Sequence, residues 1–183
     1  MEKSRQIRGI VLVNNVWVTS DWHIGHVSKM IEYCDRPINY EERILENLKK
    51  FVGDGDTLIN LGDVIFGDRN KLKPFMDQIK GTKILIRGNH DHASNNWYHQ
   101  NGFDVVCSSM IIKGVLMTHE AKHHYWGCYG NLHGHNHIGE IHEISKHHYL
   151  MSVERTNYQP VNFDKIQAAL VKNYGGDKKD IHP

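Results

Sequence analysis

The sequence predicts an α/β protein that forms one domain. Its 183 residues fall within the roughly 100–200 residues of a typical domain. Short β-branched and apolar runs alternate with stretches of helical periodicity. Several apolar runs end directly in a cluster of aspartate, asparagine or histidine. The carboxyl ends of strands in an α/β sheet carry the functional residues, so this pattern also predicts a site at the sheet edge.

The expected strands are short and mostly apolar. The first two could form a hairpin through the turn residues Asn14-Asn15, and the third follows the turn Asp54-Gly55-Asp56. We expect strands at residues 10–13, 16–19, 57–61, 83–86, 115–118, 139–144 and 148–153.

Three helices are expected because apolar residues recur on one face. In residues 40–51 this face is Ile44, Leu45, Leu48 and Phe51. The same criterion predicts helices over residues 70–79 and 162–174. The domain spans residues 1–183, and the polar segment 175–183 is expected to be a flexible tail.

Composition excludes several classes of protein. The net charge of +1 provides no strong field for nucleic acid or an anionic membrane, and no apolar run is long enough to span a bilayer. The three widely spaced cysteines argue against a disulfide scaffold and favour reduced thiols in the cytoplasm. The 15 histidines are the unusual feature, because histidine is the commonest metal-binding side chain.

Five clusters carry the chemistry. Each is weak alone, since Asp-x-His or Gly-Asp also occurs in ordinary surface turns, but together they are hard to explain by chance. They supply the imidazole and carboxylate ligands that manganese, iron, zinc or nickel prefer. A pair of such ions needs a bridging carboxylate, and it can activate water and hold phosphate oxygens. The clusters are Asp21-x-His23, Gly62-Asp63, Gly88-Asn89-His90-Asp91, His119 and Gly134-His135-Asn136-His137.

In this order, the clusters resemble the motifs of the calcineurin-like metallophosphoesterase superfamily. The segments DWHIGH, RPI, LGD, IRGNHD and NYQPVNF resemble a small bacterial and phage-type branch. The resemblance implies an α/β/β/α sandwich of two mixed β-sheets flanked by helices. It also implies two divalent metal ions, with Mn²⁺ favoured and Fe, Zn or Ni as alternatives.

The resemblance further implies a role for each residue. Asp21, His23 and His137 would hold the first metal ion. Asn89, His119 and His135 would hold the second, and Asp63 would bridge the two. A metal-bridged hydroxide would attack phosphorus, with His90 as the general acid for the leaving oxygen and Asp91 orienting His90. His26 and Arg87 are weaker candidates for binding the substrate phosphate.

Four functions remain open from the sequence. The favoured one is hydrolysis of a phosphodiester or phosphomonoester, with a small molecule or nucleotide as substrate. A nuclease of the same superfamily is less favoured, because the sequence shows no basic stripe. A non-catalytic scaffold would be expected to have lost some of the ligands. A protein that only binds or stores metal would have no need of His90.

Overall fold

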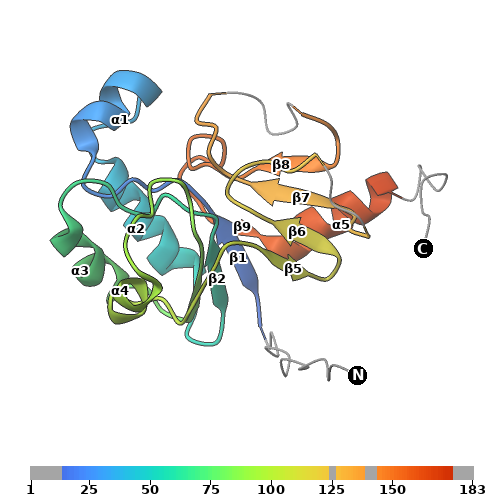
Figure 1. Ribbon diagram of the computed structural model, residues 1–183, viewed down its shortest axis with the longest axis horizontal. Helices are drawn as coiled ribbons and strands as arrows, with labels where there is room; N and C mark the ends of the chain where they lie inside the picture. The colour runs from blue at the N-terminus through green and yellow to red at the C-terminus, as the bar shows by residue number, and fades with distance from the viewer. Residues whose placement is uncertain (1–13, 124–126, 139–143, 175–183) are drawn as a thin grey trace.

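The computed structural model describes residues 14–123, 127–138 and 144–174. These residues form two β-sheets with helices packed around them (Figure 1). The expected strand at 10–13 and most of the one at 139–144 lie outside the described residues, as does the predicted tail. Within the described ranges, none of the helices has both the length and the apolar character that crossing a bilayer requires.

The first sheet has five strands in the order β4-β3-β2-β1-β9. Strands β1 to β4 run parallel, and β9 pairs antiparallel with β1, so the sheet is mixed. Thr57–Asn60 is buried on both faces, as expected of a central parallel strand. The strands are β1 (Val16–Thr19), β2 (Thr57–Asn60), β3 (Thr82–Ile86), β4 (Val105–Cys107) and β9 (Val161–Asn162).

The second sheet has four strands in the order β5-β6-β7-β8. It is also mixed, because β5 and β6 are antiparallel whereas β6, β7 and β8 are parallel. The two mixed sheets confirm the predicted fold class. The strands are β5 (Met110–Ile112), β6 (Val115–Met117), β7 (Gly130–His133) and β8 (His148–Leu150).

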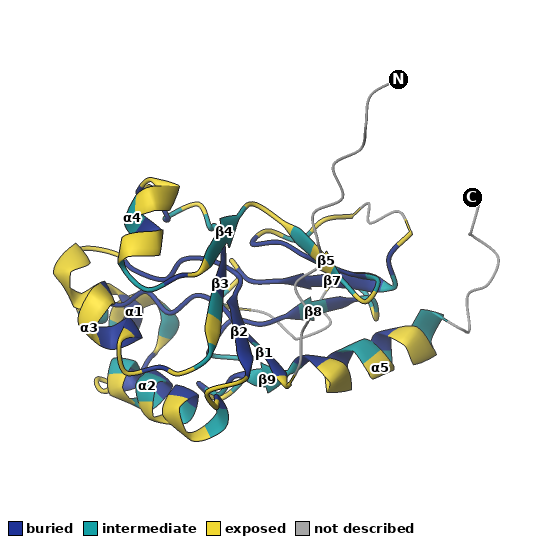
Figure 2. Cartoon of the chain, turned by 90° about the horizontal axis from the view of Figure 1, so that it is seen from below, coloured by how far each residue is buried: buried dark blue, intermediate teal, exposed yellow. Residues whose placement is uncertain are grey.

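Helices cover the face of the first sheet that points away from the second (Figures 1 and 2). Ile44 and Leu48 of α2 pack with Leu58 and Leu85 of the sheet in one apolar cluster. Burial of this kind contributes about 1.5–3 kcal/mol for each large apolar side chain. The helices on this side are α1 (Val27–Cys34), α2 (Tyr40–Phe51), the 3₁₀ turn η1 (Arg69–Lys71), α3 (Leu72–Met76) and α4 (Asn95–Gln100).

A second apolar cluster joins the two sheets. Ile59 and Ile84 of the first sheet pack there with Met117 and Leu132 of the second. Helix α5 (Phe163–Tyr174) adds its buried stripe of Phe163, Ile166 and Leu170 to the same cluster. Because this core holds the sheets together, the carboxyl ends of β1, β2 and β3 lie close to those of β6 and β7.

Within the described residues, most expected elements agree with the structure to within one residue at each end, and two of them are shorter by more than that. The helix expected over 70–79 is shorter, with the turn η1 followed by α3 over Leu72–Met76. Pro74 lacks the amide hydrogen of a helix interior, and the chain turns at Gly81 into β3. The strand expected over 148–153 ends at Leu150, because Ser152 instead forms an isolated bridge with Ser20 after β1 and the chain then turns.

Candidate metal centre

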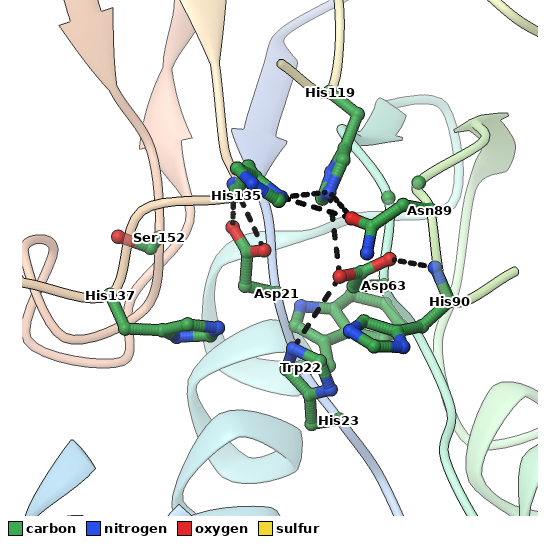
Figure 3. Close-up of polar contacts among 12 residues, drawn as sticks. Asp21, Trp22, His23, Asp63, Asn89, His90, His119, His135, His137 and Ser152 are labelled. Atoms are coloured by element: carbon green, nitrogen blue, oxygen red, sulfur yellow. Dashed lines mark hydrogen bonds and ion pairs between the residues drawn. The ribbon is translucent and has the colours of Figure 1, made fainter. Parts of the chain in front are cut away.

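Loops from both sheets bring the predicted ligands together (Figure 3). Asp21, Asp63 and Asn89 follow β1, β2 and β3, which are neighbouring parallel strands of the first sheet. The three histidines His119, His135 and His137 follow β6 and β7, which are neighbours in the second sheet. The site therefore lies where the carboxyl ends of β1, β2 and β3 meet those of β6 and β7.

The loops after β1 and β2 stay paired beyond the strands. The backbone amides of Asp21 and His23 donate to the carbonyls of Gly62 and Asp63, each over 2.9 Å. These loops are backbone-strained: Asp21, His23, Asp63 and His135 all have positive φ angles of 50–73°. Each costs about 1–3 kcal/mol, and such strain clusters at functional sites where the surroundings fix it.

The side chains form two donor groups. In the first group, ligand atoms of Asp21, His23 and His137 all lie within 4.8 Å of one another. In the second group, the same holds for Asp63, His119 and His135. The side-chain oxygen of Asn89 belongs with the second group, since it lies 2.8 Å from His119 Nε2 and 2.9 Å from His135 Nδ1.

Asp63 stands between the two groups. Its Oδ2 atom lies 3.6 Å from Nε2 of His23 and 3.4 Å from Nε2 of His119. Ligands bound at about 2.0–2.2 Å to one ion lie roughly 3–3.5 Å apart, so both separations are close to those of atoms sharing a cation. One carboxylate oxygen thus faces a member of each group.

The donor atoms fit divalent ions. Both ring nitrogens of His23 are buried, and neither has a hydrogen-bond partner among the described residues. Buried polar atoms are nearly always satisfied, so a missing partner at this position points to a bound ligand. His119 Nδ1 lies 2.8 Å from the carbonyl of Leu61, and donation there leaves Nε2 free to bind metal.

The pKa values of the two carboxylates in the metal-free protein also fit a site for divalent ions. Burial raises the pKa of the Asp21 carboxyl to about 6, although His119 and His137 lower it. Burial also acts to raise the pKa of Asp63, but hydrogen bonding to His119 and the charge of His119 outweigh it and lower that pKa. A buried carboxylate such as Asp21 needs a compensating positive charge, which a divalent cation provides.

The pKa values of two buried histidines of the site shift in opposite directions. Burial lowers the pKa of His23 to about 3, so its imidazole is neutral and can act as a ligand. Burial lowers the pKa of His119 too, but the hydrogen bond to Asp63 and the charge of Asp21 raise it overall. In the metal-free protein, a proton on His119 takes the place of the cation.

A buried ion pair supports the first donor group. The guanidinium of Arg36 donates to Glu154 over 2.7 Å, and Glu154 Oε1 lies 2.9 Å from His137 Nδ1. Arg36 also donates to the backbone carbonyls of Asp21 and Trp22. The carboxylate holds the His137 ring so that Nε2 is available to a metal ion.

Sequence reasoning missed both members of this pair. Arg36 lies within the RPI segment that carried the family resemblance, so a signal for it existed. Glu154 had no signal, because it lies 118 residues from Arg36 and 17 from His137. Only the fold brings the three together.

His90 lies beside the two donor groups. Its backbone amide donates to Asp63 Oδ1 over 2.9 Å, and its ring centroid is 5.6 Å from that of His23. His90 is half-buried, so it borders both the donor groups and solvent.

Asp91 has a different set of contacts from the one expected. Its buried carboxylate accepts hydrogen bonds from the backbone amides of Gly88, Asp63 and Val64. The described residues show no hydrogen bond between Asp91 and the His90 ring. The carboxylate ties the loop after β2 to the loop after β3, and a role for Asp91 in orienting His90 stays a prediction.

The two weaker candidates have different surroundings. Arg87 donates to the carbonyl of Asp91 and to the side chain of Asn95, the first residue of α4. These contacts use part of its donor capacity, and a role for Arg87 in binding phosphate stays a prediction. His26 lies nearer, with its ring centroid 6.2 Å from that of His23. Trp22, between the candidate ligands Asp21 and His23, is fully buried against Phe75 and packs in the core.

The fold and the paired donor groups define an α/β protein with a candidate two-metal centre. A family model described as calcineurin-like phosphoesterase matches residues 15–180. The chain therefore belongs to the calcineurin-like phosphoesterase family, whose members bind divalent metals and act on phosphoesters.

Individual relatives are more distant. The Gene 66 protein of Mycobacterium phage L5 is 32% identical over 95 residues, which are 48% of this chain and 46% of that protein. The match thus spans about half the length of the curated relative. A protein of unknown function from Aquifex aeolicus shares the fold with a TM-score of 0.69 and 24% identity, over 84% of this chain and 98% of that one. The nuclease MPE of Pseudomonas putida gives a TM-score of 0.49 and 23% identity, over 66% of this chain and 60% of that one.

Proposed function

We propose that this protein hydrolyses phosphoesters at a centre of two divalent metal ions. The ester is either a phosphodiester or a phosphomonoester. The observation that carries the proposal is the position of Asp63 Oδ2 between His23 and His119, one from each donor group. A shared carboxylate oxygen is what a two-metal phosphoesterase needs. The proposed ligands are Asp21, His23 and His137 for one ion and Asn89, His119 and His135 for the other, with Asp63 bridging; Mn²⁺ is the favoured metal.

The chain's own residues divide the work. When bound, the two cations would activate water as the nucleophile and neutralise charge on the phosphoryl oxygens. His90 is proposed to donate its proton to the leaving oxygen, because its ring borders the donor groups and faces solvent. Glu154 and Arg36 hold His137 in place, and Asp91 fixes the loops that carry Asp63 and His90.

The substrate is proposed to be a small molecule or nucleotide. The full set of seven candidate ligands together with His90 favours an enzyme over a retired scaffold or a metal store. Nucleic acid is a less favoured substrate, because the net charge of +1 offers little attraction to a polyanion.

The test is hydrolysis of bis-p-nitrophenyl phosphate and of p-nitrophenyl phosphate by protein stripped of metal and then supplied with Mn²⁺. We expect turnover of one ester by the wild type and a loss of at least about a hundredfold in kcat for Asp63→Asn. His90→Ala should lose less on these activated esters than on an alkyl ester, because p-nitrophenolate needs little protonation. Lys113→Ala, in an exposed ion pair, serves as the control.

The outcomes separate the alternatives. Binding of two Mn²⁺ ions without hydrolysis of either ester, or of an oligonucleotide, would support a scaffold or a metal store and overturn the proposal. Cleavage of the oligonucleotide alone would select the nuclease.

A further inference from the structure

Two aromatic rings outside both apolar cores lie at the edge of the candidate site: Phe66 contacts His90, and His26 contacts Phe66. Phe66 follows Ile65 in the loop after β2, yet Ile65 belongs to the core and Phe66 does not. The residue is 36% exposed. The ring of His26 lies against it, with centroids 4.2 Å apart and planes inclined by 31°.

The position of this pair is fixed by the backbone. The ladder that aligns Asp21 with Gly62 continues outwards, with Ile24 donating to Val64 over 3.1 Å and Phe66 donating to Ile24 over 2.9 Å. At its end the two loops come so close that a Cβ on Gly25 would lie 2.7 Å from the carbonyl oxygen of Phe66. His26 and Phe66 thus project from the same rigid ladder that positions the candidate metal ligands.

Phe66 also contacts the candidate general acid. Its ring meets that of His90 edge to face, with centroids 5.1 Å apart and planes at 83°. A general acid lies next to the oxygen that leaves, so a partly exposed ring in contact with His90 would border the leaving group. Partly exposed aromatic faces held rigidly at a site are stacking surfaces for flat ligands.

We propose that Phe66, backed by His26, is a stacking platform that selects substrates with a flat aromatic leaving group, such as an aryl alcohol or a base-bearing nucleoside. This inference rests on the proposed function, since it takes His90 to mark the leaving-group side. It adds no chemical step, and it makes Phe66 a specificity-determining residue. The ring offers no hydrogen bond, so the platform discriminates flat from non-flat groups and not one base from another.

The first test uses two esters whose leaving groups have similar acidity but different shape, phenyl phosphate and hexafluoroisopropyl phosphate, or their methyl diesters. We expect Phe66→Ala to lower kcat/KM on the phenyl ester about tenfold and to change the other ester less than twofold, because aromatic stacking contributes about 1–3 kcal/mol. Phe66→Tyr should keep the preference and Phe66→Leu should lose it. Ile111→Ala, an exposed apolar residue on β5, is the control.

The second test does not depend on turnover. Phenylphosphonate and cyclohexylphosphonate, which have no ester to cleave, are titrated calorimetrically into the Mn²⁺-loaded protein. The platform predicts tighter binding of the phenyl compound, with the difference lost in Phe66→Ala and reduced in His26→Ala. Equal affinities in the wild type, or a preference unchanged in Phe66→Ala, would overturn the inference.

The two tests fail separately. Flat-ligand preference without ester hydrolysis would sink the proposed function and leave the platform. Hydrolysis of both esters with no effect of Phe66→Ala would support the proposed function and overturn the stacking platform.

Discussion

The buried pair of Arg36 and Glu154 shows how single residues sustain the candidate site. Arg36 is 2% exposed and also packs over the ring of Tyr40. Burial acts to raise the pKa of Glu154, but hydrogen bonding to His137 and the charge of Arg36 lower it overall. Breaking such a pair leaves an uncompensated buried charge, which typically costs about 3–5 kcal/mol.

Replacing Glu154 by glutamine should therefore weaken both the fold and the metal site. We expect a lower free energy of unfolding, and a loss of about 10–100-fold in affinity for one metal ion, because a partner of a ligating histidine is changed. Calorimetric Mn²⁺ titration and urea unfolding measure the two effects. Asp164→Asn, in the exposed pair with Lys113, is the control and should change stability by less than about 1 kcal/mol. Unchanged metal affinity in Glu154→Gln would contradict the supporting role.

The raised pKa of His119 makes metal binding depend on pH. In the metal-free fold, its pKa of about 9 exceeds the ordinary value of 6.5. Its protonation therefore stabilises the metal-free protein fully below pH 6.5, and this contribution is lost as the pH rises through about 9. Since a ligand must be neutral, Mn²⁺ must displace this proton.

We accordingly expect Mn²⁺ affinity to rise between pH 6.5 and 9, with a proton released on binding near neutrality. Titrations in buffers of different ionisation enthalpy count that proton. The variant His119→Gln should release fewer protons. A Mn²⁺ affinity that does not change over this range would show that the metal displaces no proton from His119.

At the scale of elements, glycines allow the loops to approach one another. Gly62 has a φ angle of +111°, and a Cβ there would lie 2.6 Å from both the amide nitrogen of Gly88 and Nδ1 of His119. The loops after β2, β3 and β6 thus meet at Gly62. Any residue with a Cβ atom at this position would displace the neighbouring backbone.

Gly62→Ala should consequently disrupt the site, whereas Gly127→Ala should not. Gly127 has a φ angle of +76°, and none of the described residues places an atom within 4 Å of its Cβ position. The control therefore carries only the conformational strain, about 1 kcal/mol, while Gly62→Ala adds steric overlap with backbone. Thermal unfolding and Mn²⁺ binding compare the two variants. Equal losses in both would mean that the close approach at Gly62 has no importance of its own.

The helices and strands also differ in how well the sequence predicts them. The long amphipathic helices and the strands β1, β2, β3 and β6 were predictable, because their apolar patterns are strong and each of these strands precedes a polar cluster. Strand β7, with the sequence Gly-Asn-Leu-His, has no such pattern and exists because β6 and β8 flank it. The structure gathers all seven predicted ligands, while the pair Arg36–Glu154 and the ring of Phe66 depend on long-range contacts that the sequence pattern does not record.

The whole molecule places the candidate site across two sheets. Asp21, Asp63 and Asn89 come from the first sheet, and His119, His135 and His137 come from the second. Each donor group contains members of both, so each metal ion would cross-link the sheets.

Metal should therefore stabilise the native state as a whole. At a free concentration a hundred times Kd, one bound ion adds about 2.7 kcal/mol, which corresponds to a rise in Tm of roughly 5–11 °C for a protein of this size. Scanning calorimetry with Mn²⁺ and with a chelator measures the rise. His137→Ala should retain the part of it that comes from the other ion. A Tm insensitive to Mn²⁺ would contradict the cross-link.

The central claim is that two metal ions occupy the two donor groups with Asp63 between them. The most direct measurement is anomalous diffraction at the manganese edge from crystals grown with Mn²⁺. We expect two peaks roughly 3.5–4 Å apart, one bordered by Asp21, His23 and His137 and the other by Asn89, His119 and His135, with Asp63 touching both. A single peak, or two peaks that do not share Asp63, would contradict it.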